Sequence, residues 1–511
     1  MMCRVLTCLC AMALCPFALG QSDHADATGH AQHAHDTTTT PAIPLRSGSS
    51  QVRLDDRTLV YTWSAGTLPI LDDETGEERA QMFHVAYRVE SDTPRPVTFV
   101  FNGGPGSSSV WLHMGICGPK RIAFANDKGD PTPPPYDVVD NEHTWLAWTD
   151  LVFIDPISTG YSRPAGESEK SDFHGLEQDI ASVGDFIRLW TTRNDAWGAP
   201  KFLCGESYGT TRAAGLSLYL QERHAMYLNG IVMVSSALDF GTLRFGDGNI
   251  LPPALFLPTY AATAHYHGRL DEAYQRLSVD ELMARVEAFV ITTYTPALMM
   301  GDRLVGPERE RVVDALSRFT GTSPAFIERH RLAPPIWRFT KELLRDQERS
   351  VGRLDSRFTG IESDPGSHAP EGDPSYDVIL GPYSGAIHQH LRGELGIEDD
   401  RVYEILTGKV RPWDYGSEGN ASYVNVAPHM REAMRMNKDL HVVFQSGLYD
   451  LATPYFATDH VISQLHLDPE IRDNVTHETY PAGHMMYLHL PTLARQSRDT
   501  RAFYERVLGE D

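Results

Sequence analysis

A glycine-x-serine-x-glycine pentapeptide, residues 205–209, constrains the fold of this chain more than any other stretch. It directly follows the apolar run of residues 201–204, and a helix-like stretch, residues 210–223, comes behind it. A serine between a strand and a helix sits on a sharp, strained turn, where bulky neighbours would collide with the backbone. Glycine two positions away on each side suits that turn. The pentapeptide alone also fits an ordinary glycine-rich turn, so its meaning depends on partners elsewhere in the chain.

Strands and helices alternate in the first half of the chain. Residues 58–63 and 81–89 alternate polar and apolar side chains, as half-buried antiparallel strands do. Continuous apolar runs follow, which suit the central strands of a parallel sheet, together with one segment of helical spacing. The runs are residues 97–101, 151–154 and 230–235, and the helical segment is 173–192. We therefore predict an α/β fold with a mostly parallel sheet, whose first part spans residues 51–244.

Residues 245–425 differ in character from the first half. Proline-rich connectors separate helical stretches such as 279–289 and 308–319, and residues 360–376 are polar and rich in glycine and proline. We predict an inserted, mainly helical cap region over the carboxyl edge of the sheet, where such folds bind ligands. The alternative is a separate domain with its own function.

The sheet resumes in the last part of the chain, residues 426–511. Apolar residues 440–444 and alternating residues 475–480 predict two more strands, and residues 493–508 predict a closing helix. A chain of 511 residues is too long for one simple core, which agrees with a large domain that carries an insertion.

The N-terminus predicts export. Arg4 precedes a largely apolar stretch, residues 5–19, and small residues allow cleavage near Gly20, so residues 1–20 are typical of a signal peptide. We expect a periplasmic or secreted protein. Residues 21–50 form a polar leader, rich in histidine and threonine, which we expect to be disordered. A metal-scavenging tail is the alternative for its histidines.

Composition excludes several classes of partner. The formal net charge is −23 without an offsetting basic patch, which argues against nucleic-acid binding. The apolar stretch of the predicted signal is short and no second one follows it, so we expect no membrane span. Cys117 and Cys204 alone remain after the signal, and Cys204 in a buried strand favours a free thiol over a disulfide. We expect no cofactor and no metal, and the sequence does not determine the oligomeric state.

Three residues follow predicted strands in an order that indicates nucleophilic serine chemistry. Such chemistry needs a base that takes the serine proton and an acid that orients the base. Ser207, Asp450 and His484 lie in the order serine, acid, histidine, each just past a strand, so their loops converge at one edge of the sheet. His477 is a weaker candidate because it lies inside a predicted strand. We predict Ser207, His484 and Asp450 as a catalytic triad.

A glycine-rich turn, residues 102–109, follows the strand at 97–101. It lacks the lysine of a phosphate-binding loop and a full dinucleotide fingerprint. In a serine hydrolase, a glycine loop at this place supplies backbone N–H groups to the oxyanion. The residue after the nucleophile, Tyr208, supplies the second N–H donor.

Together these motifs resemble the serine carboxypeptidase family. The resemblance runs from about residue 80 to the C-terminus, is thin in the inserted region, and rests on Asn102-Gly103-Gly104-Pro105-Gly106, Gly205-Glu206-Ser207-Tyr208-Gly209, Asp450 and Gly483-His484. It implies an α/β-hydrolase fold and removal of one residue from the free C-terminus of a peptide. It also implies that Gly104 and Tyr208 form the oxyanion hole, and that the substrate carboxylate is held by Asn102, Gly103 and Glu206.

The chain departs from the family pattern at three positions. Ile116 stands where the family usually has a second glutamate, which removes one hydrogen-bonding partner of the carboxylate. Ser107 replaces a cysteine of a family disulfide, and Leu448 replaces an aspartate two positions before Asp450. A glutamate beside the nucleophile would repel a carboxylate unless it carries a proton, and two carboxyls that share a proton raise one pKa.

The sequence therefore predicts an exported serine carboxypeptidase that acts through an acyl-enzyme on peptides with a free C-terminus. An esterase or acyltransferase with the same triad is the alternative within this fold. A secreted binding protein with a decayed site is the alternative from another class.

Overall fold

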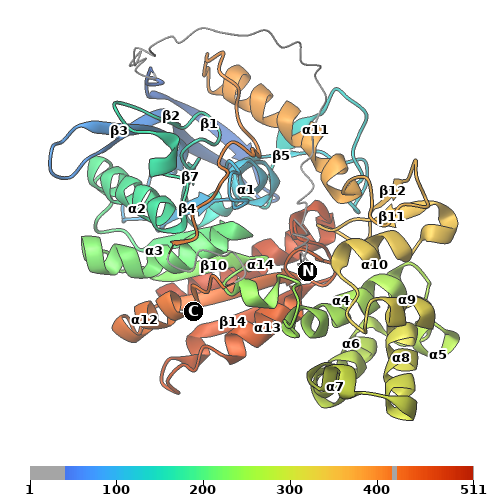
Figure 1. Cartoon of the computed structure of the whole chain (residues 1–511). Coiled ribbons are helices and arrows are strands. Elements are labelled where there is room, and N and C mark those ends of the chain that lie inside the picture. Colours follow the sequence, from blue (N-terminus) through green and yellow to red (C-terminus); the bar gives the residue numbers. More distant parts are fainter. Residues whose placement is uncertain (1–40, 417–422, 510–511) are drawn as a thin grey trace, which may run out of the picture. The chain divides into compact units, whose positions relative to one another are not determined.

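The computed structural model of the chain describes residues 41–416 and 423–509 (Figure 1). The predicted signal, residues 1–20, and the leader up to residue 40 lie outside the described residues. Residues 417–422, between the two ranges, lie outside them as well.

A ten-stranded sheet forms the centre of the molecule, in the order β1-β2-β3-β7-β4-β9-β10-β13-β14, with β8 paired to β3. The strands from β7 to β14 run parallel, and β1, β2 and β3 run antiparallel to their neighbours. The strands are β1 (Arg46–Arg53), β2 (Thr58–Leu71), β3 (Glu78–Arg88), β4 (Val97–Phe101), β7 (Asp150–Ile154), β8 (Arg163–Pro164), β9 (Lys201–Glu206), β10 (Gly230–Val234), β13 (His441–Gly447) and β14 (Val475–Tyr480).

The central strands are buried because helices cover both faces of the sheet. Every residue of β4, β7, β9 and β10 is buried, which explains their continuous apolar sequences. Strand β4 lies between β7 and β9, although β7 follows β4 in the chain. This crossover and the parallel order confirm the predicted α/β-hydrolase fold.

Strand β1 corrects the predicted leader, because Arg46–Ser50 belong to a strand and the ordered chain therefore begins before residue 51. β1 pairs with β2 over its whole length, at the edge of the sheet. Only Val52 is fully covered, and Gly48 lies flat against the ring of Trp63. An exposed edge strand needs few apolar residues, so the polar sequence of this segment did not predict it.

Each face of the sheet has its own apolar core. Helices α2 (Leu176–Arg193), α3 (Tyr208–His224) and α12 (Ala427–Met436) pack on one face. On the other face lie α1 (Val110–Leu112), the π-helical turn His113–Cys117, α11 (Pro374–His388) and α14 (Leu490–Leu508). Figure 1 shows α2 and α3 beside each other in green.

The inserted region is mainly helical, as predicted. Its helices form the third apolar core of the molecule, which also includes Leu448 and Leu451 from the loop after β13 and Tyr455 at the start of helix Tyr455–Ser463. Helix α11 instead joins the core beneath the sheet, so the insertion and the sheet pack as one unit. The other elements of the insertion are α4 (Leu251–Tyr266), α5 (Glu272–Gln275), α6 (Val279–Phe289), α7 (Thr295–Met300), α8 (Gly306–Thr320), α9 (Pro324–Arg329), α10 (Ile336–Glu342), β11 (Arg349–Val351) and β12 (Thr359–Ile361).

Further short elements include β5 (Lys120–Ile122), β6 (Val138–Asp140) and α13 (Tyr455–Ser463). Within the described residues, no helix combines the length and the apolar character that crossing a membrane requires.

Trp190 of α2 offers a test of the packing between helices and sheet. Its side chain is 1% exposed and meets Phe99 of β4 edge to face, with the ring centroids 5.6 Å apart. Trp190→Ala should lower the free energy of unfolding by about 3–5 kcal/mol, because it leaves a cavity between α2 and the sheet. Trp197→Ala is the matched control: this side chain is 46% exposed, so the loss should stay below about 1 kcal/mol. Equal losses in urea denaturation would contradict this packing.

Candidate active site

Ser207 lies on a strained turn between β9 and α3. Its backbone has φ 60° and ψ −127°, a conformation that costs a residue with a side chain on the order of 1–3 kcal/mol. The N–H of Ser207 donates to the carbonyl oxygen of Val234 at 2.9 Å, which fixes the turn against β10. The strand, sharp turn and helix that the pentapeptide predicts are all present.

Glycines make this turn possible by close backbone packing. A Cβ atom on Gly205 would lie 2.3 Å from the carbonyl oxygen of Gly209, and one on Gly209 would lie 2.8 Å from that of Phe101. A Cβ on Gly103 would lie 2.3 Å from the nitrogen of Tyr208. The loop after β4 therefore lies directly against the first turn of α3, beside the N–H predicted as an oxyanion donor. Gly104, in the same loop, has φ 108°, which favours glycine.

Asp450 is fully buried in the loop after β13, and both oxygens of its carboxylate are hydrogen-bonded. One oxygen accepts the N–H groups of Ala452 and Thr453 at 2.7 and 3.0 Å. The other accepts the Thr453 hydroxyl at 2.6 Å and lies 2.7 Å from Nδ1 of His484. These hydrogen bonds fix the orientation of the carboxylate toward the imidazole of His484.

His484 is buried with Asp450 at the edge of the sheet. Burial lowers the pKa of its imidazole, but the charge of Asp450 and the hydrogen bond to it outweigh burial, so the pKa is raised overall. The hydroxyl of Ser235, just after β10, donates to the carbonyl oxygen of His484 at 2.6 Å. Since β10 also holds the turn at Ser207, the end of this strand ties the serine and histidine loops together.

A second serine, histidine and aspartate set shows how the candidate triad differs from a structural cluster. Nδ1 of His477 lies 2.6 Å from Asp459, and its Nε2 lies 2.9 Å from the hydroxyl of Ser446. Ser446, however, lies inside β13 in regular strand conformation and is fully buried. His477 lies inside β14, as the sequence predicts, so this set has no strained turn or exposed nucleophile.

The segment 353–357 of the insertion connects the aspartate and histidine loops. The carbonyl oxygens of Arg353 and Leu354 accept the N–H groups of Leu451 and His484, at 3.0 and 2.6 Å. Asp355 accepts the N–H of Gly483 at 3.1 Å, and Ser356 donates to the carbonyl of Tyr449. The sequence does not predict this role, because nothing in the composition of the segment separates it from other turns of the insertion.

Glu206 lies beside the nucleophile, 3% exposed, with both carboxyl oxygens bonded. The side-chain amide of Asn102 donates to one oxygen at 3.0 Å, and the hydroxyl of Tyr487 to the other at 2.7 Å. Burial raises the pKa of Glu206 to about 7, although the charge of His484 and these hydrogen bonds lower it. A carboxyl with this pKa carries a proton over the acidic range, which is what binding another carboxylate requires.

A buried ion pair supports Asn102. Arg212 of α3 is 1% exposed, pairs with Asp179 of α2 at 2.8 Å and donates to the carbonyl oxygen of Asn102 at 2.7 Å. The sequence does not predict this support, because the three residues are far apart in the chain. Two helices thereby fix the loop that contacts Glu206.

Ile116 and the two cysteines lie behind the candidate site. Ile116 is buried in the π-helical turn, in the core on that face of the sheet. Cys117 and Cys204 are buried free thiols, as the sequence favours. Burial, followed by the nearby Cys204 and Glu206, raises the pKa of Cys117 well above its usual value. Cys117 is therefore a protonated packing group rather than a nucleophile.

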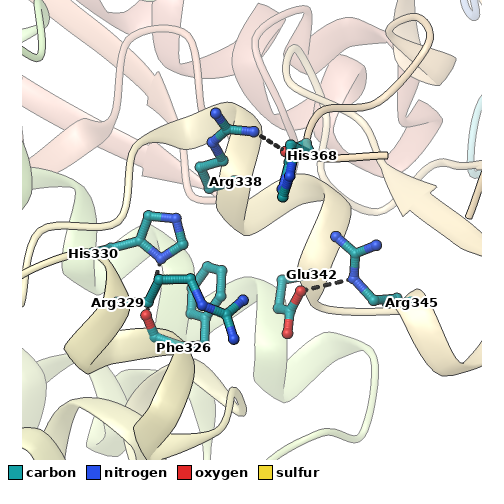
Figure 2. A pocket seen from close by; sticks show the side chains of 7 residues that line it. All are labelled: Phe326, Arg329, His330, Arg338, Glu342, Arg345 and His368. Carbon is teal, nitrogen blue, oxygen red and sulfur yellow. Dashed lines mark hydrogen bonds and ion pairs between the residues drawn. The ribbon is translucent and has the colours of Figure 1, made fainter. Parts of the chain in front are cut away.

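A cavity of about 300 Å³ lies elsewhere, within the inserted helices (Figure 2). Two of its arginines contact other residues of its wall: Arg338 donates to the carbonyl oxygen of His368, and Arg345 pairs with Glu342 at 2.8 Å. The sticks in Figure 2 show these pairs along the walls. None of the candidate triad residues lines this cavity, so we assign it no part in the chemistry. Within the described residues, no group of three or more His, Cys, Asp or Glu side chains could hold a metal ion.

Comparison with known proteins agrees with these motifs. The serine carboxypeptidase family model matches residues 71–284. Serine carboxypeptidase-like 46 of Arabidopsis thaliana is 21% identical over 265 residues, which cover 46% of this chain and 54% of the relative. Pheromone-processing carboxypeptidase KEX1 of Yarrowia lipolytica is 27% identical over 183 residues, 35% of this chain and 27% of the relative. The chain thus spans 54% or less of the length of these two relatives.

This chain is thus similar to serine carboxypeptidases over residues 71–284, in agreement with the resemblance that its motifs carry. Among solved structures, it resembles Est816, described as an N-acyl homoserine lactone degrading enzyme, with a TM-score of 0.36 and 10% identity. That likeness covers 85% of this chain and 100% of the other. At this TM-score it carries no weight, and the strand order and the strained turn at Ser207 define the α/β-hydrolase fold.

Removing the charge of Asp450 tests the proposed triad. Asp450→Asn should lower kcat for an activated ester about 10³–10⁴-fold, because an amide cannot stabilise the imidazolium or hold its tautomer. Asp459→Asn, which alters the equivalent pair at His477, is the matched control and should change kcat less than about threefold. Circular dichroism spectra check that both variants are folded. A similar loss of kcat in both folded variants would show that Asp450 has no special role.

Proposed function

We propose that this protein is a serine carboxypeptidase that hydrolyses the C-terminal peptide bond of its substrates through Ser207, His484 and Asp450. The observation that carries the proposal is the buried Glu206, directly beside the nucleophile and able to hold a proton up to about neutral pH. A hydrolase of other esters and amides has no need of a carboxyl in that place, whereas an exopeptidase has to read a carboxylate.

In the first step, Oγ of Ser207 attacks the carbonyl carbon of the last peptide bond while Nε2 of His484 takes its proton. Asp450 stabilises the imidazolium so formed, through the 2.7 Å contact with Nδ1. The backbone N–H groups of Gly104 and Tyr208 are proposed to bind the oxyanion. The C–N bond then breaks, and His484 gives its proton to the leaving amine, which departs as the C-terminal amino acid.

In the second step, water attacks the acyl-enzyme. His484 takes a proton from the water, the ester bond to Ser207 breaks, and the serine oxygen recovers its proton from the imidazolium. The shortened peptide leaves with a new carboxylate. With the substrate and one water molecule, the bonds and protons of both steps balance.

The substrate carboxylate is proposed to lie against Asn102, Gly103 and protonated Glu206. Neutral Glu206 can donate its proton in a hydrogen bond to the carboxylate, whereas ionised Glu206 repels it. The same triad would also serve an esterase or acyltransferase, and the protonatable Glu206 is what favours the peptidase. Export of the protein, to the periplasm or beyond the cell, is part of this proposal and rests on the sequence alone.

The pH dependence of peptide hydrolysis tests this proposal. As pH rises through about 7, Glu206 loses its proton, so kcat/KM for a blocked dipeptide should fall about tenfold per pH unit. A blocked amino-acid ester makes no contact with Glu206, so its kcat/KM should not fall over that range. Both are measured by stopped-time assays from pH 4 to 9, which are about the limits of ordinary buffers, with Ser207→Ala as the background.

Glu206→Gln is the control for this profile. An amide stays neutral at every pH, so the fall in peptide kcat/KM should disappear, even if its value at acidic pH is reduced. Parallel profiles for peptide and ester in the native protein would contradict the proposal. The absence of any free amino acid product while the ester is hydrolysed would support the esterase instead.

A further inference from the structure

Two tyrosines that sequence analysis did not find lie beside Glu206. Tyr487 follows the histidine loop, and Tyr383 belongs to α11 of the insertion. Both side chains are buried, at 2% and 0% exposure. They meet across Gly115, where an added Cβ would lie 2.3 Å from the ring of Tyr487 and 2.9 Å from the hydroxyl of Tyr383.

The hydroxyl of Tyr487 donates a hydrogen bond to a carboxyl oxygen of Glu206 at 2.7 Å. Asn102 holds the other oxygen of the same carboxyl. Hydrogen bonds at both oxygens keep the Glu206 carboxyl in one orientation. Tyr487 thereby takes the place of the second glutamate that the family usually has at the position of Ile116. Ile116, next to Gly115, cannot contribute, because its side chain has no polar atom.

The hydroxyl of Tyr383 is the unused group of this cluster. It is buried, yet among the described residues it has no hydrogen-bond partner. A buried hydroxyl without a partner is costly, so such a group needs an explanation such as a missing ligand. Burial and then the charge of Glu206 raise the pKa of Tyr383, which places this phenol in the electrostatic field of the carboxyl and keeps it a donor.

We propose that Tyr487 and Tyr383 complete the pocket for the terminal carboxylate of the substrate. Tyr487 is a positioning residue that orients Glu206, and Tyr383 is a specificity-determining residue whose free hydroxyl donates to the carboxylate itself. This inference rests on the proposed function, because it assigns residues to the same site. The groups that face Glu206 are His484, Asp450, Tyr487, Tyr383 and Cys117.

Single hydroxyl deletions separate the two roles. Tyr487→Phe removes a hydrogen bond that favours ionised Glu206, so the pH midpoint of peptide hydrolysis should move up by about half to one unit. Tyr383→Phe should raise the peptide KM about 3–10-fold and leave that midpoint in place. Each peptide value is compared with kcat/KM of the same variant for a blocked ester, which separates an effect on carboxylate binding from a general loss of activity. Tyr219→Phe is the matched control. It removes the hydrogen bond from the hydroxyl of Tyr219 in α3 to Asp185 in α2, and it should change none of these values.

An infrared titration distinguishes a failure of this inference from a failure of the proposed function. The C=O band of protonated Glu206 is identified by its absence in Glu206→Gln, and its loss with pH needs no substrate. The midpoint of this loss should be higher in Tyr487→Phe than in the native protein. If it shifts while no amino acid is released, the proposed function is wrong and the positioning role stands. An unshifted midpoint, or an unchanged peptide KM in Tyr383→Phe, would overturn the corresponding assignment.

Discussion

The structure depends on the close contact between three backbone segments around Ser207. The loop after β4, the end of β9 and the first turn of α3 approach so closely that a Cβ on Gly103, Gly205 or Gly209 would lie within 2.8 Å of a backbone atom. This contact holds Ser207 in a conformation that a free serine avoids. The cost is offset by the surrounding sheet, whose central strands are wholly buried. The same contact sets Glu206 beside the serine and Asn102 against Glu206, so the nucleophile and the proposed carboxylate pocket share one origin.

The other half of the site depends on the insertion. Segment 353–357 hydrogen-bonds to the loops of Asp450 and His484, and α11 contributes Tyr383 next to Glu206. A cap that only covered the sheet would provide no hydrogen bonds to the loops of Asp450 and His484. Here its backbone carbonyls accept the N–H groups of Leu451 and His484, so the insertion stabilises the proposed base as well as the substrate pocket.

The sheet, the strained turn at Ser207 and the candidate triad could be predicted from the sequence because each has a local signal. Buried strands are continuous apolar runs, and glycines mark the strained turn at Ser207. The order serine, acid, histidine along the chain predicts that Ser207, Asp450 and His484 act together. Strand β1 could not be predicted, because an exposed edge strand needs no apolar pattern. The roles of Arg212, Tyr487 and Tyr383 could not be predicted either. These three act through contacts between residues about 100 to 300 positions apart. The departure at Ile116 was visible, but only the fold shows that Tyr487 bonds to Glu206 from another loop.

The central claim is that this site reads a free C-terminal carboxylate. The most direct measurement compares one blocked dipeptide with its own C-terminal amide, at a pH below 7 where Glu206 is protonated. The account predicts that kcat/KM is at least about tenfold higher for the free acid, a difference of about 1.4 kcal/mol in binding to the transition state. Equal values for acid and amide, or a preference for the amide, would contradict it.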